Sequence, residues 1–122
     1  MPTQEIYLDQ QVGDRRVQIV KTYDEQYARE VFEEMDESAQ AHLWNSLKVE
    51  ENYDPEDIPS LNGPDGESFL WEELLDAARE DGNLHSFFVV CEATGGNPKG
   101  LYVSPDWPSA EAFAKKHITT LQ

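Results

Sequence analysis

The uninterrupted apolar run FFVVC at residues 87–91 is the feature that most restricts how this chain can fold. A short run of aromatic and β-branched residues bounded by turn residues is typical of a buried strand, which we expect over residues 86–93. Gly95-Gly96-Asn97-Pro98 follows as a turn, and residues 100–104 form a shorter strand, so the two strands make a hairpin. The sequence therefore predicts a β-sheet.

A second hairpin is expected near the N-terminus. Apolar and polar residues alternate over residues 5–8 and again over residues 16–23, and Gly13-Asp14 provides turn chemistry between these two segments. Together the two hairpins supply about four strands.

The first hairpin leads into a helix. Residues 22–25, with the sequence TYDE, have the spacing of a capping box, and apolar side chains recur beyond them at helical spacing, so a helix is predicted to begin near Asp24. The apolar stripe drifts around the helix axis towards Leu47. Either one curved helix therefore runs to about Leu47, or a break falls near residues 36–38.

Residues 48–67 are expected to form a long loop. Three prolines and two glycines among seven acids oppose both helix and strand, and loops of this length are usually functional or mobile. Ser68 is then expected to cap a helix over residues 69–81, which Gly82-Asn83 ends. Pro108 opens a last helix with an apolar stripe.

These elements, in the order ββα-α-ββα, predict an α+β fold with a sheet of about four antiparallel strands and two or three helices packed on one face. The length favours one domain over residues 1–122, in which residues 24–81 form an acidic helix-loop-helix insertion between two neutral ββ units. No apolar stretch approaches the roughly 18 residues that span a bilayer. The N-terminus lacks a signal-peptide pattern, and the single Cys91 cannot form an internal disulfide, which favours a cytoplasmic protein.

The negative charge is confined to one part of the chain. The chain has 25 acidic and 9 basic residues, a net charge of −16. Residues 24–81 contain 19 of these acids and only three bases, so the rest of the chain is neutral. A surface that is acidic only for solubility would carry an excess of acidic over basic residues on every exposed segment, and this chain does not. The charge also disfavours direct binding to nucleic acid or to an anionic membrane, because both require Lys and Arg.

We expect the acids of residues 24–81 to form an anionic surface that binds a basic partner. Each of the two helices carries acids in one sector, opposite its apolar stripe and almost without Lys or Arg. Like charges at these spacings repel unless a cation is bound; a merely solvated helix face is the alternative interpretation. Tyr53, among acids, is the expected aromatic anchor. The predicted partner-binding residues are Glu30, Glu33, Glu34, Glu37, Glu50, Glu51, Tyr53, Asp54, Glu56, Asp57, Glu72, Glu73, Asp76 and Glu80.

Four functions follow as hypotheses. The leading one is a non-enzymatic acidic binding protein, an inhibitor or regulator, that binds a basic nucleic-acid-binding protein as a DNA mimic. The first alternative is an immunity protein that neutralises a cognate toxin, with specificity from Tyr53 and Trp44. The second is a small enzyme or ligand-binding domain with a pocket between sheet and helices, lined by Cys91, His85 or His117. The third is a housekeeping domain with no site on the acidic face. Copies with a net charge of −16 repel, so a monomer is expected.

The sequence favours no catalytic centre, cofactor or metal. Cys91 lies inside the apolar run and is expected to be an inert buried thiol. His42, His85 and His117 lack zinc-binding spacing, and no Gly-x-Gly-x-x-Gly or Walker-type loop supports nucleotide binding. The acids of residues 48–67 lack the spacing of a calcium loop, and prolines interrupt them.

Overall fold

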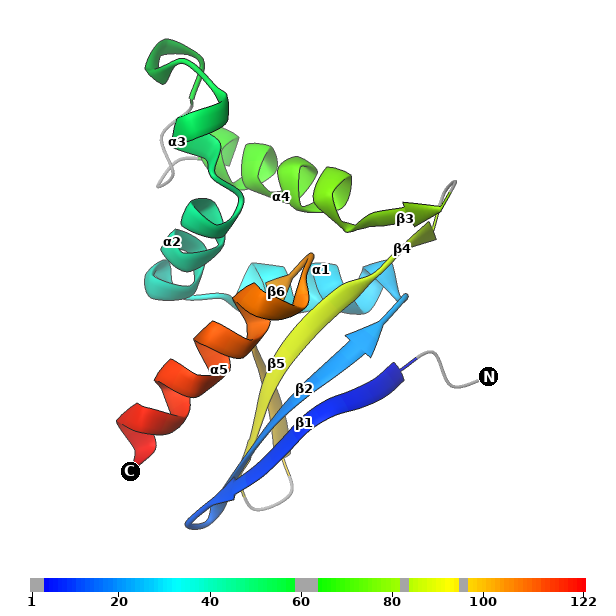
Figure 1. Ribbon diagram of the computed structural model, residues 1–122, viewed down its shortest axis with the longest axis vertical. Coiled ribbons are helices and arrows are strands. Elements are labelled where there is room, and N and C mark those ends of the chain that lie inside the picture. Colours follow the sequence, from blue (N-terminus) through cyan, green and yellow to red (C-terminus); the bar gives the residue numbers. More distant parts are fainter. Residues whose placement is uncertain (1–3, 59–63, 82–83, 95–96) are drawn as a thin grey trace.

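The computed structural model describes residues 4–58, 64–81, 84–94 and 97–122. Its centre is a four-stranded antiparallel sheet in the order β1-β2-β5-β6, with helices around it (Figure 1). The strands are β1 (Gln4–Val12), β2 (Arg15–Thr22), β5 (Phe87–Thr94) and β6 (Asn97–Ser104). The α+β class and the sheet built from two hairpins are therefore confirmed. β1 and β6 both extend further than the alternating patterns indicated.

The helical elements follow in two groups, one between β2 and β5 and one after β6. They are α1 (Glu25–Glu34), α2 (Glu37–Ser46), α3 (Val49–Asn52), the 3-10 turn η1 (Pro55–Asp57), α4 (Pro64–Ala78) and α5 (Trp107–Leu121). None of the helices in the described ranges combines the length and the apolar character that crossing a bilayer requires.

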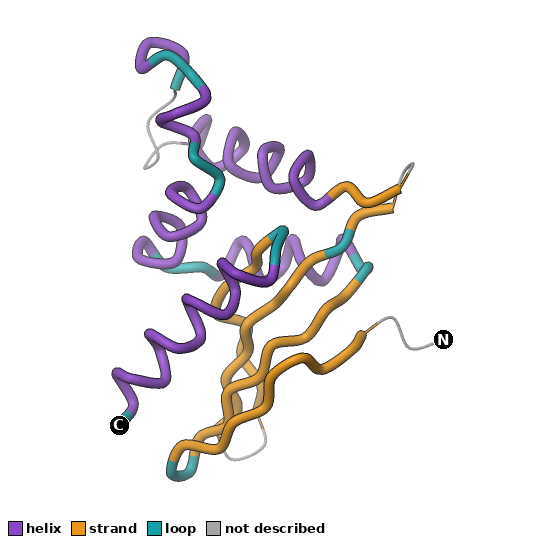
Figure 2. The backbone as a smooth tube through the Cα atoms, in the orientation of Figure 1, coloured by secondary structure: helices purple, strands orange, loops and turns teal. Residues whose placement is uncertain are grey.

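The helices cover both faces of the sheet, with α5 in front and α1 behind in the view of Figures 1 and 2. Successive strand residues point to opposite faces. Cys91 of β5 lies 3.3 Å from the hydroxyl of Tyr27 in α1, whereas Oε1 of Glu92 lies 3.2 Å from Nε2 of His117 in α5. Packing on one face was expected, but residues 87–91 are all buried, so β5 needs cover on both faces.

Two aspartates end the ambiguity about the first helical segment. Asp24 caps α1, because its Oδ1 accepts a hydrogen bond from the backbone N–H of Tyr27 at 3.2 Å. The capping box predicted from Thr22 is wrong: Oγ1 of Thr22 accepts a hydrogen bond from the backbone N–H of Asp24 instead. Asp36 caps α2 by accepting from the backbone N–H of Ala39 at 2.8 Å. The segment is thus two capped helices with a break, the second of the two predicted alternatives.

The long loop expected over residues 48–67 is wrong, because α3, η1 and the start of α4 lie within it. Pro55 and Pro64 each stand at the beginning of a helical segment, where proline's missing N–H has no helical partner to lose. Lys48 turns the chain between α2 and α3 with a left-handed backbone (φ 56°). Ser68 lies inside α4 rather than at its N-cap.

α4 ends at Ala78, three residues before the expected end of this helix, because the chain turns into a short β-ribbon. β3 (Arg79–Asp81) pairs with β4 (Leu84–His85), and the backbone N–H of Ser86 donates to the carbonyl of Ala78 at 2.9 Å. The predicted helix stop at Gly82-Asn83 lies outside the described residues, as does Gly95-Gly96 of the second hairpin turn.

Aromatic packing fixes α4 against the rest of the core. The ring of Trp71 stacks on Phe87 of β5 with ring centroids 6.2 Å apart, and it lies 5.2 Å from the ring of Phe32 in α1. Leu70 and Leu74, on the same helix, are 1% and 0% exposed. α4 is therefore held by its apolar face, and its acidic residues Glu72 and Asp76 are exposed, whereas Glu73 is partly buried.

Candidate functional site

The acids of α1 lie on its exposed side. Glu30, Glu33 and Glu34 are all exposed, whereas Ala28 and Val31 of the same helix are buried. The amphipathic pattern of the sequence is confirmed for this helix. Glu37 is also exposed, but it belongs to the first turn of α2, so the predicted row of four acids on one helix is divided by the break at Asp36.

The next group of candidate residues follows α2, and all its members are exposed. It occupies α3, η1 and the residues beside them, a segment that carries no base of its own after Lys48. The members are Glu50, Glu51, Tyr53, Asp54, Glu56 and Asp57.

On α4 the predicted acidic sector is only partly present. Glu72 and Asp76 are exposed, whereas Glu73 is half-buried. Glu80 was predicted on the same helix face, but it belongs to β3 because the helix ends at Ala78. Its side chain lies outside the described part of the structure.

Few of these carboxylates are neutralised within the chain. Among the described side chains, Glu33 is the one candidate acid with a basic partner, Nε of Arg29 at 3.0 Å. Arg29 also lies over the rings of Phe32 and Trp71, 5.4 and 5.1 Å from their centroids. One of the three bases in residues 24–81 is therefore already occupied by packing and pairing. The excess negative charge faces solvent.

Tyr53 stands where the sequence predicted an exposed aromatic residue, with 41% of its surface accessible. Its ring meets the ring of Phe69 edge to face at 5.4 Å, which fixes its direction. Its hydroxyl lies beside the carboxylate of Glu73, and this interaction, followed by partial burial and by the charges of Glu73 and Asp76, raises the pKa of Tyr53. Tyr53 therefore lies beside two carboxylates of α4, Glu73 and Asp76.

A hollow of about 510 Å³ opens beside Tyr53, between the α2–α3 segment and α4. Tyr53, Glu73 and Asp76 were predicted site residues, and the structure brings them together. Sequence patterns did not reveal the apolar and amide residues that complete the hollow, because no periodicity indicates which residues of two separate helices meet. The lining residues are Leu47, Asn52, Tyr53, Glu73, Asp76 and Ala77.

Trp44 does not share the exposed position of Tyr53. It is 6% exposed and packs against Phe69 with ring centroids 5.8 Å apart. The immunity-protein hypothesis took specificity from Trp44 as well as Tyr53, so one of its two anchors is unavailable at the surface.

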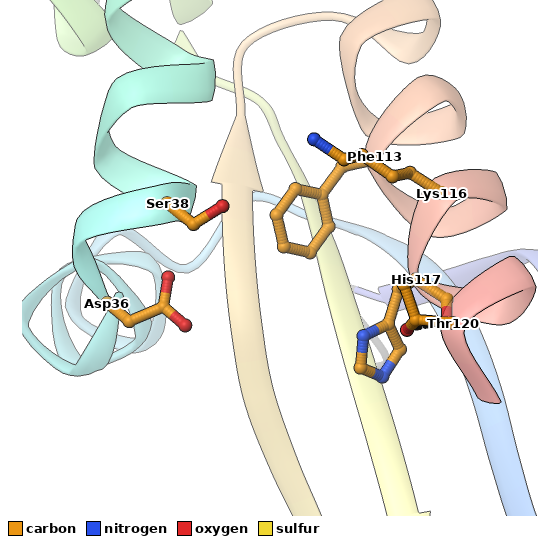
Figure 3. A pocket seen from close by; sticks show the side chains of 6 residues that line it. All are labelled: Asp36, Ser38, Phe113, Lys116, His117 and Thr120. Carbon is orange, nitrogen blue, oxygen red and sulfur yellow. Dashed lines mark hydrogen bonds between the residues drawn. The ribbon is translucent and has the colours of Figure 1, made fainter.

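Cys91 and His117 line two smaller hollows, which bear on the hypothesis of a ligand pocket between sheet and helices. The hollow beside Cys91 measures about 380 Å³ and lies between α1 and β6. The hollow beside His117 measures about 140 Å³; Figure 3 shows Asp36, the N-cap of α2, and Ser38 of α2 on one side of it and the α5 residues on the other. The α5 residues there are Phe113, Lys116, His117 and Thr120.

The chemistry of these two hollows is limited. Burial raises the pKa of the Cys91 thiol, and the adjacent hydroxyl of Tyr27 opposes this only in part. The predicted burial of Cys91 is confirmed, and its raised pKa is the opposite of the lowered pKa that activates a thiol nucleophile. His117 lies against Glu92, and His85 lies 3.6 Å from Glu25 and stacks against Phe87. In the described ranges, no three His, Cys, Asp or Glu side chains lie together as metal ligands.

Comparison of the chain with models of protein families, with curated proteins and with solved structures gives no match.

Proposed function

We propose that this protein is a non-enzymatic binding protein, an inhibitor or regulator, whose acidic helices bind a basic partner protein. The observation that carries the proposal is the exposure of many candidate carboxylates on α1, α3, η1 and α4, of which only Glu33 has a basic partner among the described side chains. An acidic surface of this kind attracts a positively charged surface over several ångströms and discriminates against acidic proteins.

The partner that fits best is a nucleic-acid-binding protein. Such proteins expose rows of Lys and Arg that normally contact phosphates. Carboxylates on neighbouring helices can occupy the same Lys and Arg side chains, and the protein then competes with nucleic acid as a DNA mimic does. We expect it to act as a monomer, because association through the acidic helices would bring like charges together. The single cysteine is consistent with a cytoplasmic location.

Affinity capture at low salt tests this proposal. The immobilised protein is incubated with lysate of its native cell, and the column is eluted first with duplex DNA and then with rising NaCl. We expect a basic nucleic-acid-binding protein that both DNA and salt displace. Identification of the eluted protein by mass spectrometry, followed by binding of the purified pair, completes the measurement.

A matched pair of triple variants controls for charge alone. Glu50→Gln/Glu51→Gln/Asp54→Asn removes three charges from the acidic segment, and Glu5→Gln/Asp14→Asn/Glu111→Gln removes three charges from the neutral remainder. Partner binding should weaken about tenfold or more in the first variant and remain within about twofold in the second. Equal losses, or a captured partner indifferent to salt, would exclude an anionic surface as the binding site.

A further inference from the structure

The hollow beside Tyr53 differs from the rest of the acidic surface, because it combines carboxylates with an apolar floor. Glu73 and Asp76 come from α4, and the Tyr53 ring and the Asn52 amide come from the segment that follows α2. Leu47 and Ala77 supply apolar surface. At about 510 Å³ it is larger than the hollows beside Cys91 and His117, and it has room for a long side chain.

One oxygen in this hollow lacks the partner that its position requires. Oε1 of Glu73 is buried, and it has no hydrogen-bond partner within the described part of the chain. The Tyr53 hydroxyl lies beside the carboxylate but does not satisfy this oxygen. A buried carboxylate oxygen without a donor is costly, and native structures usually satisfy such atoms with protein, water or ligand. Because Glu73 also lines the hollow, a turn of its carboxylate towards the hollow would bring this oxygen within reach of a hydrogen-bond donor placed there.

We propose that this hollow receives an arginine side chain of the basic partner, with its guanidinium between Glu73 and Asp76 and against the ring of Tyr53. The inference rests on the proposed function, because it names the contact by which the acidic surface recognises its partner. It assigns specificity to one concave site on a surface whose other carboxylates supply long-range attraction.

Arginine fits this set of residues better than lysine does. A guanidinium is planar, presents five N–H donors and can stack on an aromatic ring while it donates to two carboxylates. Its methylene stem can cover the apolar surface of Leu47 and Ala77. A lysine ammonium is a strongly hydrated point charge that uses neither the ring nor two separated carboxylates so well. Two carboxylates are also too few to hold a divalent metal without further ligands.

Titration with short peptides tests the assignment on the full chain. The ¹⁵N-labelled protein is titrated at low salt with acetyl-Gly-Arg-Gly-amide, with the lysine peptide and with the citrulline peptide, which keeps the shape of arginine but is neutral. We expect the arginine peptide to give saturable shifts at residues 47, 52, 53, 73, 76 and 77. The lysine peptide should bind at least about threefold more weakly, and the citrulline peptide should give no saturable shift. Shifts that do not saturate, or arginine and lysine peptides of equal affinity, would overturn the proposal.

Single substitutions locate the contact. Glu73→Gln should weaken the arginine peptide about tenfold or more, because it removes a charge-assisted hydrogen bond. Glu30→Gln makes the same chemical change on α1, outside the hollow, and should alter the affinity by less than about twofold. Asp76→Asn provides a second test at an exposed position should Glu73→Gln fail to fold. Equal effects of Glu73→Gln and Glu30→Gln, or no effect of Asp76→Asn, would contradict the proposal.

Different results would exclude the proposed function and the proposed arginine site. If a salt-sensitive basic protein is captured but the arginine peptide binds no defined place, the proposed function stands and the hollow is not its recognition site. If no basic protein is captured from the lysate, the proposed function is wrong whatever the peptide does.

Discussion

Gly100 lies where β6 comes against α1, and the close approach leaves no room for a side chain. A Cβ at this position would lie 2.6 Å from Cγ2 and 2.9 Å from Cγ1 of Val31, which is 3% exposed and, being β-branched, has little rotamer freedom. Gly100→Ala should therefore lower the free energy of unfolding by about 1–3 kcal/mol, measured by urea denaturation. In a Val31→Ala background the same change should cost less, and an equal cost in both backgrounds would show that Val31 is not the obstacle.

The contact between Tyr27 and Cys91 predicts that stability falls at alkaline pH. Burial is the largest cause of a raised pKa at both groups, relative to ordinary values of 10.0 for tyrosine and 9.0 for cysteine. The folded chain therefore keeps protons that the unfolded chain loses as pH rises above 9. Because the folded state binds more protons, the free energy of unfolding should be constant below pH 9 with respect to these groups and should fall above it.

Urea denaturation at about pH 8 and about pH 10.5 measures this effect, and Tyr27→Phe isolates its source. The variant has no phenol to ionise, so its stability should fall less steeply between the two pH values than that of the parent chain. The same decline in both proteins would mean that groups other than Tyr27 are responsible.

At the scale of elements, the break between α1 and α2 depends on the cap that Asp36 provides. Its carboxylate accepts from the backbone N–H of Ala39 at 2.8 Å, and the amide of Gln40 also donates to the carbonyl of Met35 across the break. Asp36→Ala should cost about 1 kcal/mol of stability, whereas Asp36→Ser should cost little because serine also caps helices. Thermal denaturation distinguishes the two. If Asp36→Ser is as unstable as Asp36→Ala, the cap is not the source of the effect.

The four strands of the main sheet could be predicted from the sequence, the β3–β4 ribbon could not, and the acidic helices could be predicted only in part. Strand alternation and the apolar run at residues 87–91 are local signals, so both hairpins were found. The apolar run also contained the information that β5 is covered on both faces, but the run alone does not say which helix lies on which face. Pro55 and Pro64 were interpreted as helix breakers, although at the first turn of a helix proline breaks nothing.

The sequence predicted which residues of the candidate site are exposed, but it did not predict which distant segments pack together to form the site. Helical periodicity correctly separated the exposed acids of α1 from its buried face. The helix end near residue 81 was wrong because Ala78 accepts a hydrogen bond from Ser86, a contact across the β3–β4 ribbon that no local pattern contains. The hollow beside Tyr53 is likewise formed by two segments that lie 20 or more residues apart in the sequence, so composition indicated its acids but not its shape.

At the scale of the whole molecule, the entire net charge belongs to residues 24–81, which are mostly helical, whereas the four-stranded sheet, α5 and their connections are together neutral. Concentrated like charge opposes folding through self-repulsion, and it does so most where residues of the same sign are neighbours on one helix. On α1, Glu30 and Glu34 are such neighbours, both exposed. These repulsions are present before a partner binds, and they lower the free energy of unfolding. Dissolved salt screens the carboxylates and should reduce this cost.

Salt and charge substitution together test this cost. Raising NaCl from about 10 mM to about 300 mM should increase the free energy of unfolding by roughly 1 kcal/mol, because screening weakens the repulsion between carboxylates. Glu30→Gln/Glu34→Gln should stabilise the chain by a few tenths of a kcal/mol at low salt, with a smaller dependence on salt. Glu111→Gln is the matched control on α5, where Glu111 lies 3.8 Å from Lys115. Removing this favourable pair should leave stability unchanged or slightly lower. If Glu30→Gln/Glu34→Gln destabilises the chain as well, the acids of α1 are not in net repulsion. The exposed acids of α1 then have no stability cost, and such a cost does not support a role for them in binding a partner.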